Sequence, residues 1–510
     1  MNWKHTVKSF LFVAVLAVSL CSIANGQTRF KVSIDPSLAL KQPVSGRLLI
    51  FMRKSDKPLE SIEPELLDSN AVWIAGTEVV TGGSFEIDAD KVAFPTPFSS
   101  APPGEYQVMA VLDRNHSYTY FGYTDAGDLL SAVQRVTMPA GETSLTLSRI
   151  VPEKDRGSHP SAKSVEFESP RLSAFWGRPI KMQAAIMLPA SYFTSGKKTY
   201  PTAYIIHGYG GGQTPPNIPQ AAETALKQMK DGNLPEMIYV FLNAHNSLGH
   251  HVFADSVNNG PWGTALVDEF IPYLEKQFRM DARPSSRFLT GHSSGGWATL
   301  WVMVTHPDFF GGTWSTSPDP VNFHNFTGPD IYAPGANAYH DGSGKEYGLV
   351  RVGGRDVATL RQFARQESVL GEYGGQFASF NAVFSPKADD GRPMKLFDVE
   401  TGAIDPFVAN EWARYDISRI LRDNWKTLGR KLKGKIHIVV GTADTFHLDE
   451  PTRLLDAELK ELGSDAKFEY LEGRTHFDLY QGGLRNRMFR EMYAVARPAS
   501  KAKSAEKAAK

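Results

Sequence analysis

The sequence predicts an α/β fold preceded by an all-β domain of immunoglobulin-like shape, and three features of its 510 residues support this prediction. Short alternating apolar runs, separated by proline and glycine, fill the first part of the chain and favour strands joined by turns. Further along, apolar strand-like runs alternate with helical runs, which is typical of a parallel sheet covered by helices. Several of these runs end in glycine-rich turns, where open α/β sheets carry their functional groups.

Residues 1–26 have the pattern of a secretory signal peptide. Two lysines precede an apolar run from Phe10 to Leu20, and the small residues Ala24-Asn25-Gly26 supply a cleavage site. The run is too short to span a bilayer, and no other stretch of the chain is apolar for long enough. The single cysteine, Cys21, lies in this segment after a leucine, which disfavours a lipid anchor and leaves the mature chain without disulfides. We therefore expect a secreted or periplasmic protein that begins near Gln27 and has no membrane span.

Residues 27–150 are expected to form the β-sandwich. Runs such as Arg29 to Ile34 and Tyr106 to Val111 are short and bounded by turn residues, and no long helical period interrupts them. The domain lacks the cysteine pair of immunoglobulins. Two roles stay open for it, namely packing at the edge of a binding pocket and binding carbohydrate. The polar stretch 151–163 follows as a linker.

The segment Gly291-His292-Ser293-Ser294-Gly295 forms a G-x-S-x-G pattern between an apolar run, Arg287 to Thr290, and a helical run, Gly296 to Val304. This pattern is typical of a tight strand-to-helix turn that lifts a serine hydroxyl clear of a sheet as a nucleophile. Ser293 is the candidate, because Ser294 would need a glycine where His292 stands. An ordinary turn in a glycine-rich chain is the alternative interpretation.

A serine nucleophile needs a histidine base and a carboxylate that orients this base, here in the chain order serine, acid, histidine. Asp444 follows the apolar run Lys435 to Gly441, and His476 lies in the loop after the run Lys467 to Leu471. Both stand at the ends of predicted parallel strands, so we expect them to complete a catalytic triad with Ser293. The competing interpretations are a turn-capping aspartate and a surface histidine.

An acyl-transfer site also needs backbone N–H groups that hold the developing oxyanion. The predicted strand Pro201 to Ile206 ends in the loop His207-Gly208-Tyr209-Gly210-Gly211-Gly212, which is suited to supply one of them. Tyr209 is the first choice and Gly210 the second, and the N–H of Ser294 is the other donor. The loop has neither of the glycine patterns of nucleotide-binding loops, which disfavours a phosphate site.

These residues together resemble the Putative esterase family, which includes esterase D, feruloyl esterases, enterochelin-type siderophore esterases and mycolyltransferases. The resemblance is carried by Ser169 to Pro189, Tyr200-Pro201, His207-Gly208, Asn259-Gly260-Pro261-Trp262-Gly263, the Ser293 elbow, Asp444 and His476. It implies an α/β-hydrolase domain over residues 164–497 with a triad of Ser293, Asp444 and His476. It also implies hydrolysis of carboxylic esters without a cofactor.

The chain departs from the family between the sixth and seventh strands, where about 120 residues, 315–434, replace a shorter connection. Glycine-rich loops alternate there with helical runs such as Val357 to Leu370 and Asn410 to Leu428. We expect a cap-like insertion that lies over the site and selects the substrate. We also expect that residues 335–386 can be replaced by a short linker without loss of the fold.

Four further side chains are candidates for the substrate-binding surface. His207 and His292 belong to the two loops described above, and Trp262 and Trp314 are suited to stack on an acyl group. Each tryptophan suits the core equally well. The pair His250-His251 lacks a third ligand at a familiar spacing, so we expect no metal site.

The 55 basic and 55 acidic residues balance, so we expect neither nucleic acid nor an anionic membrane as a partner. The tail 498–510 is too polar to pack and is expected to be disordered. The sequence favours a secreted serine esterase that acts on a small-molecule or carbohydrate-linked ester and resembles the feruloyl and siderophore-type enzymes. A peptidase or acyltransferase with the same triad is one alternative, and an inactive carbohydrate-binding or scaffold protein is another. The oligomeric state stays open.

Overall fold

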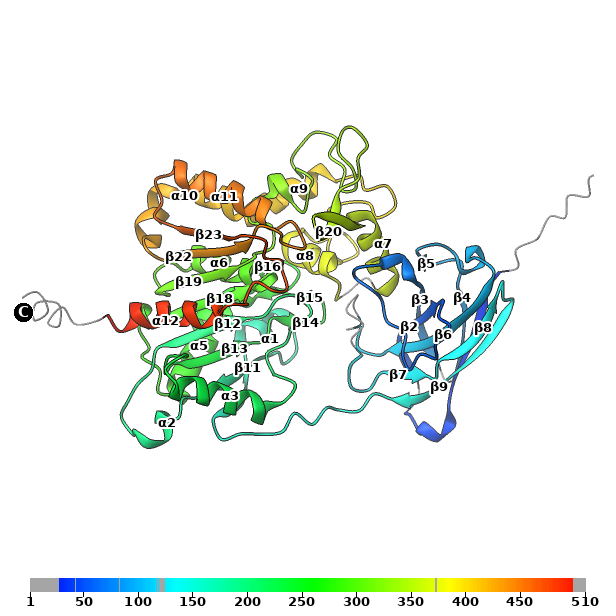
Figure 1. Ribbon diagram of the computed structural model, residues 1–510, viewed down its shortest axis with the longest axis horizontal. Helices are drawn as coiled ribbons and strands as arrows, with labels where there is room; N and C mark the ends of the chain where they lie inside the picture. The colour runs from blue at the N-terminus through cyan, green and yellow to red at the C-terminus, as the bar shows by residue number, and fades with distance from the viewer. Residues whose placement is uncertain are drawn as a thin grey trace, which may run out of the picture.

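The structure is a computed structural model that describes residues 27–498, except 42, 82, 117, 119–123 and 372–373. The predicted signal peptide, with Cys21, lies outside the described residues, as does all but the first residue of the 498–510 tail. Among the described residues no helix has the length and apolar character needed to cross a membrane. Figure 1 shows a β-rich part, formed by the first third of the chain, and a larger part that mixes helices and strands.

Residues 29–150 form strands joined by turns. The strands are β1 (Arg29–Ile34), β2 (Val44–Arg53), β3 (Val72–Thr81), β4 (Ser84–Asp88), β5 (Ala93–Phe94), β6 (Gly104–Asp113), β7 (Leu129–Ser131), β8 (Gln134–Met138) and β9 (Glu142–Ile150). They pair in the order β4-β1-β9-β7-β6-β2-β3-β5, with β8 also paired to β6. The pair β1–β9 is parallel and the other pairs are antiparallel.

Strand β2 is apolar along most of its length because both of its faces are covered. Its side chains alternate between two apolar cores, with Leu48, Ile50 and Met52 in one and Leu49 and Phe51 in the other. Helix α7 (Leu360–Leu370), from much later in the chain, packs against β3 and β5 on the second side (Figure 1). Arg47 Nη2 donates to the Val369 carbonyl at 2.7 Å across this contact. The β-rich part and the larger part therefore share a buried interface.

The larger part is built on an eight-stranded sheet. Its strands are β10 (Ala162–Glu168), β11 (Lys181–Met187), β12 (Thr202–Ile206), β13 (Ile238–Leu242), β18 (Arg287–His292), β19 (Gly312–Thr316), β22 (Ile436–Gly441) and β23 (Lys467–Leu471). They pair in the order β10-β11-β13-β12-β18-β19-β22-β23. The first two pairs are antiparallel and the rest are parallel. This mixed α/β arrangement confirms the fold class predicted for the larger part and is the one expected of an α/β-hydrolase.

Helices cover both faces of this sheet. Helices α3 (Ile218–Lys230) and α12 (Leu484–Ala496) share an apolar core with one face, and α6 (Ser294–Thr305), α5 (Ile271–Gln277), α10 (Ile417–Leu432) and α11 (Asp449–Glu461) lie in the core on the other (Figure 1). Shorter elements lie in the loops, namely α1 (Pro170–Trp176), α2 (Ser191–Thr194), α4 (Trp262–Ala265) and the two-residue strands β14 (His245–Asn246), β15 (Gly249–His250), β16 (Asp255–Ser256) and β17 (Gly260–Pro261). A π-helical turn, Leu266–Phe270, joins α4 to α5.

The segment between β19 and β22 carries its own elements. They are the hairpin β20 (Gly348–Val352) and β21 (Arg355–Thr359), then α7, α8 (Gln376–Phe384), α9 (Pro406–Trp412) and α10. Helix α7 begins at Leu360 rather than at the expected Val357, because Thr359 and Gln362 form a capping box. The helical run expected from Asn410 is two helices, because Asp416 caps the start of α10.

This segment is part of the main core rather than a detachable cap. The side chains of Leu349, Phe380 and Phe384 are buried in the same apolar core as the central sheet. Removing residues 335–386 would take them out of that core and leave cavities and exposed apolar surface. The structure therefore contradicts the expectation that this stretch can be replaced without loss of the fold.

Candidate active site

The turn between β18 and α6 has the backbone geometry of a nucleophile elbow. Ser293 has φ 59° and ψ −125°, which a residue with a side chain adopts only under strain. A side chain on Gly291 would overlap the Gly295 carbonyl, and one on Gly295 would overlap the Ile206 carbonyl at the end of β12. The two flanking glycines therefore let the elbow lie directly against the neighbouring strand, which explains the sequence pattern.

The loop after β12 lies over the elbow. A side chain on Gly208 would come within 2.9 Å of the His292 carbonyl and 3.1 Å of Ser293 Cβ. The Tyr209 hydroxyl donates to the Gly374 carbonyl at 2.6 Å, and Gly210 adopts the left-handed region at φ 71°. Ser294 is the first residue of α6, where the helix itself supplies no acceptor for the backbone N–H. Gly208 of this loop and the Ser294 N–H thus both lie next to Ser293, and Tyr209, Gly210 and Ser294 stay the predicted donors to an oxyanion.

Asp444 and His476 lie side by side at the ends of β22 and β23. His476 Nδ1 is 2.9 Å from Asp444 Oδ2, and since an ionised carboxylate only accepts, Nδ1 carries the proton that is donated. The side chains are 5% and 0% exposed, respectively. Burial alone would raise the pKa of Asp444, but the charge and hydrogen bond of His476, with the Phe446 N–H, hold that pKa below its usual value. Asp444 therefore stays ionised and fixes His476 with Nε2 free of a proton.

The hydroxyl of Ser293 has an unexpected partner. It donates to Asp319 Oδ1 at 3.2 Å, and among the described residues it makes no hydrogen bond to His476. The hydroxyl of Ser294 donates to the other oxygen of the same carboxylate at 2.5 Å. Sequence reasoning missed Asp319, although it comes three residues after β19, at the same edge of the sheet as the other candidates.

Comparisons with known proteins identify the family of the chain. The family model described as "Putative esterase" matches residues 177–493, well over half of the chain. The chain belongs to this esterase family. An endo-1,4-beta-xylanase/feruloyl esterase of Xylanibacter ruminicola is 27% identical over 169 residues, which are 32% of this chain and 23% of that protein. An esterase of Mycobacterium tuberculosis is 28% identical over 132 residues, which are 26% of this chain and 28% of that protein. The chain therefore spans only about a quarter of the length of each of these two relatives.

Solved structures are similar to about two thirds of the chain. A ferulic acid esterase has a TM-score of 0.42 at 15% identity and covers 66% of this chain and 98% of its own. The S-formylglutathione hydrolase FrmB of Staphylococcus aureus has a TM-score of 0.37 at 15% identity and covers 66% of this chain and 99% of its own.

His207 supports the candidate oxyanion loop, residues 207–212. Its Nε2 accepts the Ala244 N–H at 3.1 Å, so Nδ1 carries the proton and donates to the Gly208 carbonyl at 2.8 Å. Burial lowers the pKa of His207, in keeping with this neutral form. Both ring nitrogens are used within the protein. Neither ring nitrogen is therefore left for a substrate, although His207 was expected on the substrate-binding surface.

His292 packs against the candidate base. Its ring lies 4.3 Å from the ring of His476, and its Nδ1 is 3.1 Å from Thr316 Oγ1. Burial, followed by the charge of His476, lowers the pKa of His292 to about 3. His292 is therefore a neutral neighbour that limits the movement of His476.

The two candidate tryptophans are core residues. Trp314 lies between the sheet and α12, stacked on His437 at 4.2 Å, with its indole N–H donated to Glu491 at 2.8 Å. Trp262 is stacked on His251 at 3.8 Å and donates to the Asn259 carbonyl at 2.9 Å. Both are almost fully buried, so the expectation that they contact an acyl group is wrong.

The histidines of the loop after β13 form a neutral cluster. The His250 ring is 5.1 Å from that of His207 and 5.3 Å from that of His245. Burial, followed by the neighbouring histidines, holds the pKa of His250 well below its usual value. In the part of the chain that the structure describes, no group of three or more metal-ligating side chains is arranged to hold a metal ion.

Apolar side chains lie beside the candidate base. The side chain of Phe477 is 62% exposed although it is large and apolar. Its ring is 5.5 Å from the ring of His476 and 5.8 Å from that of the half-buried Phe446. Burying these rings on a ligand would be favourable, so they form a candidate surface for an apolar part of a substrate.

The insertion also contacts the candidate site. Arg351 of β20 donates to the Asp444 carbonyl from Nη2 at 2.8 Å and from Nε at 3.2 Å, and its backbone N–H donates to the Thr445 carbonyl at 2.7 Å. Its guanidinium also pairs with Asp449 at 3.0 Å. The hairpin β20–β21 therefore supports the loop that carries Asp444.

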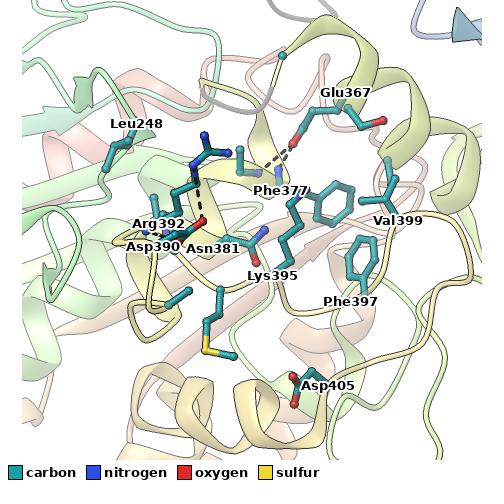
Figure 2. A pocket seen from close by; sticks show the side chains of 18 residues that line it. Leu248, Glu367, Phe377, Asn381, Asp390, Arg392, Lys395, Phe397, Val399 and Asp405 are labelled. Atoms are coloured by element: carbon teal, nitrogen blue, oxygen red, sulfur yellow. Dashed lines mark hydrogen bonds and ion pairs between the residues drawn. The ribbon is translucent and has the colours of Figure 1, made fainter. Parts of the chain in front are cut away.

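A cavity of about 490 Å³ lies within the insertion, and its lining includes none of Ser293, Asp444 and His476 (Figure 2). Two of its acidic residues are occupied by helix capping. Glu367 accepts the first backbone N–H groups of α8, and Asp405 accepts those of α9. These carboxylates are structural.

Proposed function

We propose that this esterase hydrolyses carboxylic esters through an acyl-enzyme on Ser293, with His476 as the base and Asp444 as the carboxylate that orients it. The observation that carries the proposal is the buried hydrogen bond from His476 to Asp444 at the same sheet edge as a strained serine elbow. Membership of the esterase family supports the reaction class.

In the first half of the reaction, His476 Nε2 takes the proton of Ser293 Oγ while Oγ attacks the ester carbonyl carbon. The carbonyl oxygen becomes an oxyanion that accepts from the N–H groups of Ser294 and Tyr209. The imidazolium then gives its proton to the leaving alcohol. In the second half, His476 takes a proton from water, whose oxygen attacks the acyl carbon. The bond between that carbon and Ser293 Oγ then breaks, Oγ takes the proton back from His476, and the free acid leaves.

The substrate that we propose is an ester, free or linked to carbohydrate, with an aromatic or other apolar group beside the scissile bond. The exposed Phe477 and its neighbour Phe446 support this choice, because they offer an apolar surface next to the base. The relative from Xylanibacter ruminicola is named as a feruloyl esterase, which also favours an aromatic acyl group. Siderophore-type esters are the other substrate class to be tested. The signal-peptide pattern of residues 1–26 supports secretion.

We further propose that residues 27–150 are an immunoglobulin-like domain whose role is packing, and that residues 315–434 form an insertion beside the site. The packing of α7 on β3 and β5 supports this role, because the insertion thereby covers part of a sheet that a carbohydrate-binding domain would expose. The domain thus holds the insertion in place.

The test is active-site labelling with a fluorophosphonate together with hydrolysis of a panel of feruloyl, acetyl-sugar, siderophore and short acyl esters. We expect Ser293→Ala to lose labelling and hydrolysis while it keeps the fold, because the change deletes one oxygen. Ser285→Ala, an exposed serine before β18, is the matched control. If Ser293→Ala keeps more than about a hundredth of the activity, the proposal is wrong. Faster turnover of amides, or transfer to an added alcohol, would instead indicate a peptidase or acyltransferase.

A further inference from the structure

Asp319 is a buried carboxylate in the candidate active site that the proposed mechanism does not use. It lies in the turn after β19 and is 3% exposed. Two backbone hydrogen bonds hold this turn in place. The Asp319 N–H donates to the Ser293 carbonyl at 3.2 Å, and the Ser317 N–H donates to the Val439 carbonyl at 2.8 Å. The carboxylate is thereby fixed against the first turn of α6, beside the nucleophile.

Two features of its surroundings favour the charged form of this carboxylate. It accepts from the hydroxyls of Ser293 and Ser294, and it lies at the N-terminal end of α6, where the helix dipole favours a negative charge. A side chain on Gly296 would come within 2.7 Å of the Thr316 carbonyl, so the turn is packed tightly on this helix. The carboxylate has little room to turn away from Ser293.

The titratable groups that face Asp319 are His476 and Asp444. Burial raises the pKa of Asp319 to about 6, against the lowering effects of the Ser294 hydroxyl, the charge of His476 and the Ser293 hydroxyl, while Asp444 adds a smaller increase. Asp319 is therefore ionised at neutral pH and close enough to His476 to interact with its charge.

We propose that Asp319 is a positioning residue that holds the Ser293 hydroxyl between turnovers and stabilises the charged form of His476 during them. When an ester binds, the Ser293 hydroxyl turns from Asp319 to His476 Nε2, and its proton moves there as Oγ attacks. The imidazolium then lies beside two carboxylates, Asp444 and Asp319, both of which remain ionised. An opposite charge nearby favours the protonated form of a histidine. This inference rests on the proposed function of Ser293 and His476.

Asp319→Asn keeps the shape of the side chain and removes its charge. We expect kcat to fall about tenfold with KM unchanged, because the interaction acts on proton transfer rather than on ester binding. We also expect the acidic limb of the kcat/KM profile to move to lower pH by about one unit, because the variant lacks a negative charge beside the site of proton transfer.

The matched control is Asp281→Asn. The side chain of Asp281 is also only 5% exposed and pairs with Arg497 at 2.6 Å, but it lies near the amino end of β12, at the opposite edge of the sheet. We expect this control to lower the apparent Tm and to leave the pH profile in place.

Three results would overturn the inference. If Asp319→Asn lowers the apparent Tm but leaves both the acidic limb and the fluorophosphonate labelling rate unchanged, Asp319 only joins the β19 turn to α6. An increase in kcat would mean that the carboxylate hinders the reaction, and a KM change alone would place it in substrate binding. Should Asp319→Asn fail to fold, Asp319→Ser keeps an acceptor for the two hydroxyls, and the same shift of the acidic limb of its kcat/KM profile is measured. Failure of the proposed function is distinct, because Ser293→Ala would then keep its activity.

Discussion

Replacing Arg351 by methionine tests whether the insertion supports the chemistry of the site. The guanidinium donates to the Asp444 carbonyl at 2.8 and 3.2 Å and pairs with Asp449 at 3.0 Å. Methionine keeps the length and most of the apolar stem of the side chain and removes these interactions. The change is therefore specific for the contact between β20 and the loop that follows β22.

Two losses determine the size of the effect. The Asp444 carbonyl loses a charged donor, which is worth about 1.5–3 kcal/mol. Asp449, whose side chain is 9% exposed, loses its nearest cation, and breaking a fully buried pair costs about 3–5 kcal/mol. Since Arg351 is partly exposed and Arg453 lies 3.7 Å from Asp449, we expect less than the sum of the two lower limits, about 3 kcal/mol in total. A freer Asp444 loop should also lower kcat about tenfold, because small displacements of catalytic groups are costly.

The assay compares the apparent Tm and kcat of wild type, Arg351→Met and the control Arg419→Ala. Arg419 makes an exposed ion pair with Asp423 on α10, so its loss should cost less than about 0.5 kcal/mol and leave kcat unchanged. If Arg351→Met matches this control in both measurements, the hairpin β20–β21 does not support the loop that carries Asp444. A lower Tm with an unchanged kcat would restrict its role to stability.

Three further predictions follow from the site and its surroundings. Adding His476→Ala to Ser293→Ala should lower the rate of ester hydrolysis by less than about threefold beyond Ser293→Ala alone, because the two act as one unit; additive losses would count against this. Gly208→Ala should lower kcat about a hundredfold with little change in KM, because the new methyl group meets the His292 carbonyl and displaces the oxyanion loop; an unchanged kcat would place the loop elsewhere. Burial raises the pKa of Glu367 from 4.5 to about 7, so the folded state holds its proton more tightly than the unfolded state. The stabilisation from the protonated Glu367 is therefore present below about pH 4.5 and is lost as the pH rises to about 7. Thermal melting curves should show that the wild type loses stability relative to Glu367→Gln across this pH range. An equal pH dependence of the two proteins would contradict the pKa shift.

Local patterns were enough to predict the mixed α/β class and the esterase family, both of which are confirmed. The Ser293 elbow could be named from its sequence because the close approach of two backbones requires glycine at two fixed positions. Asp444 and His476 could be named because each follows a strand-like run, and parallel strands bring their carboxyl ends to one edge. The predicted start of α7, Val357, lies three residues before the observed start, Leu360. The end of β21 is apolar enough to resemble the first turn of a helix.

The sequence by itself thus determined which residues stand at the strand ends, since that depends on periodicity and turn chemistry within a few residues. Only the tertiary structure decided what those residues touch. Asp319 meets Ser293 across 26 residues, and Arg351 meets Asp444 across 93. It also decided that Trp314 is buried under α12 and that α7 packs against β3 and β5. Such contacts depend on strand order and on the packing of distant elements, and periodicity along the chain carries no information about either.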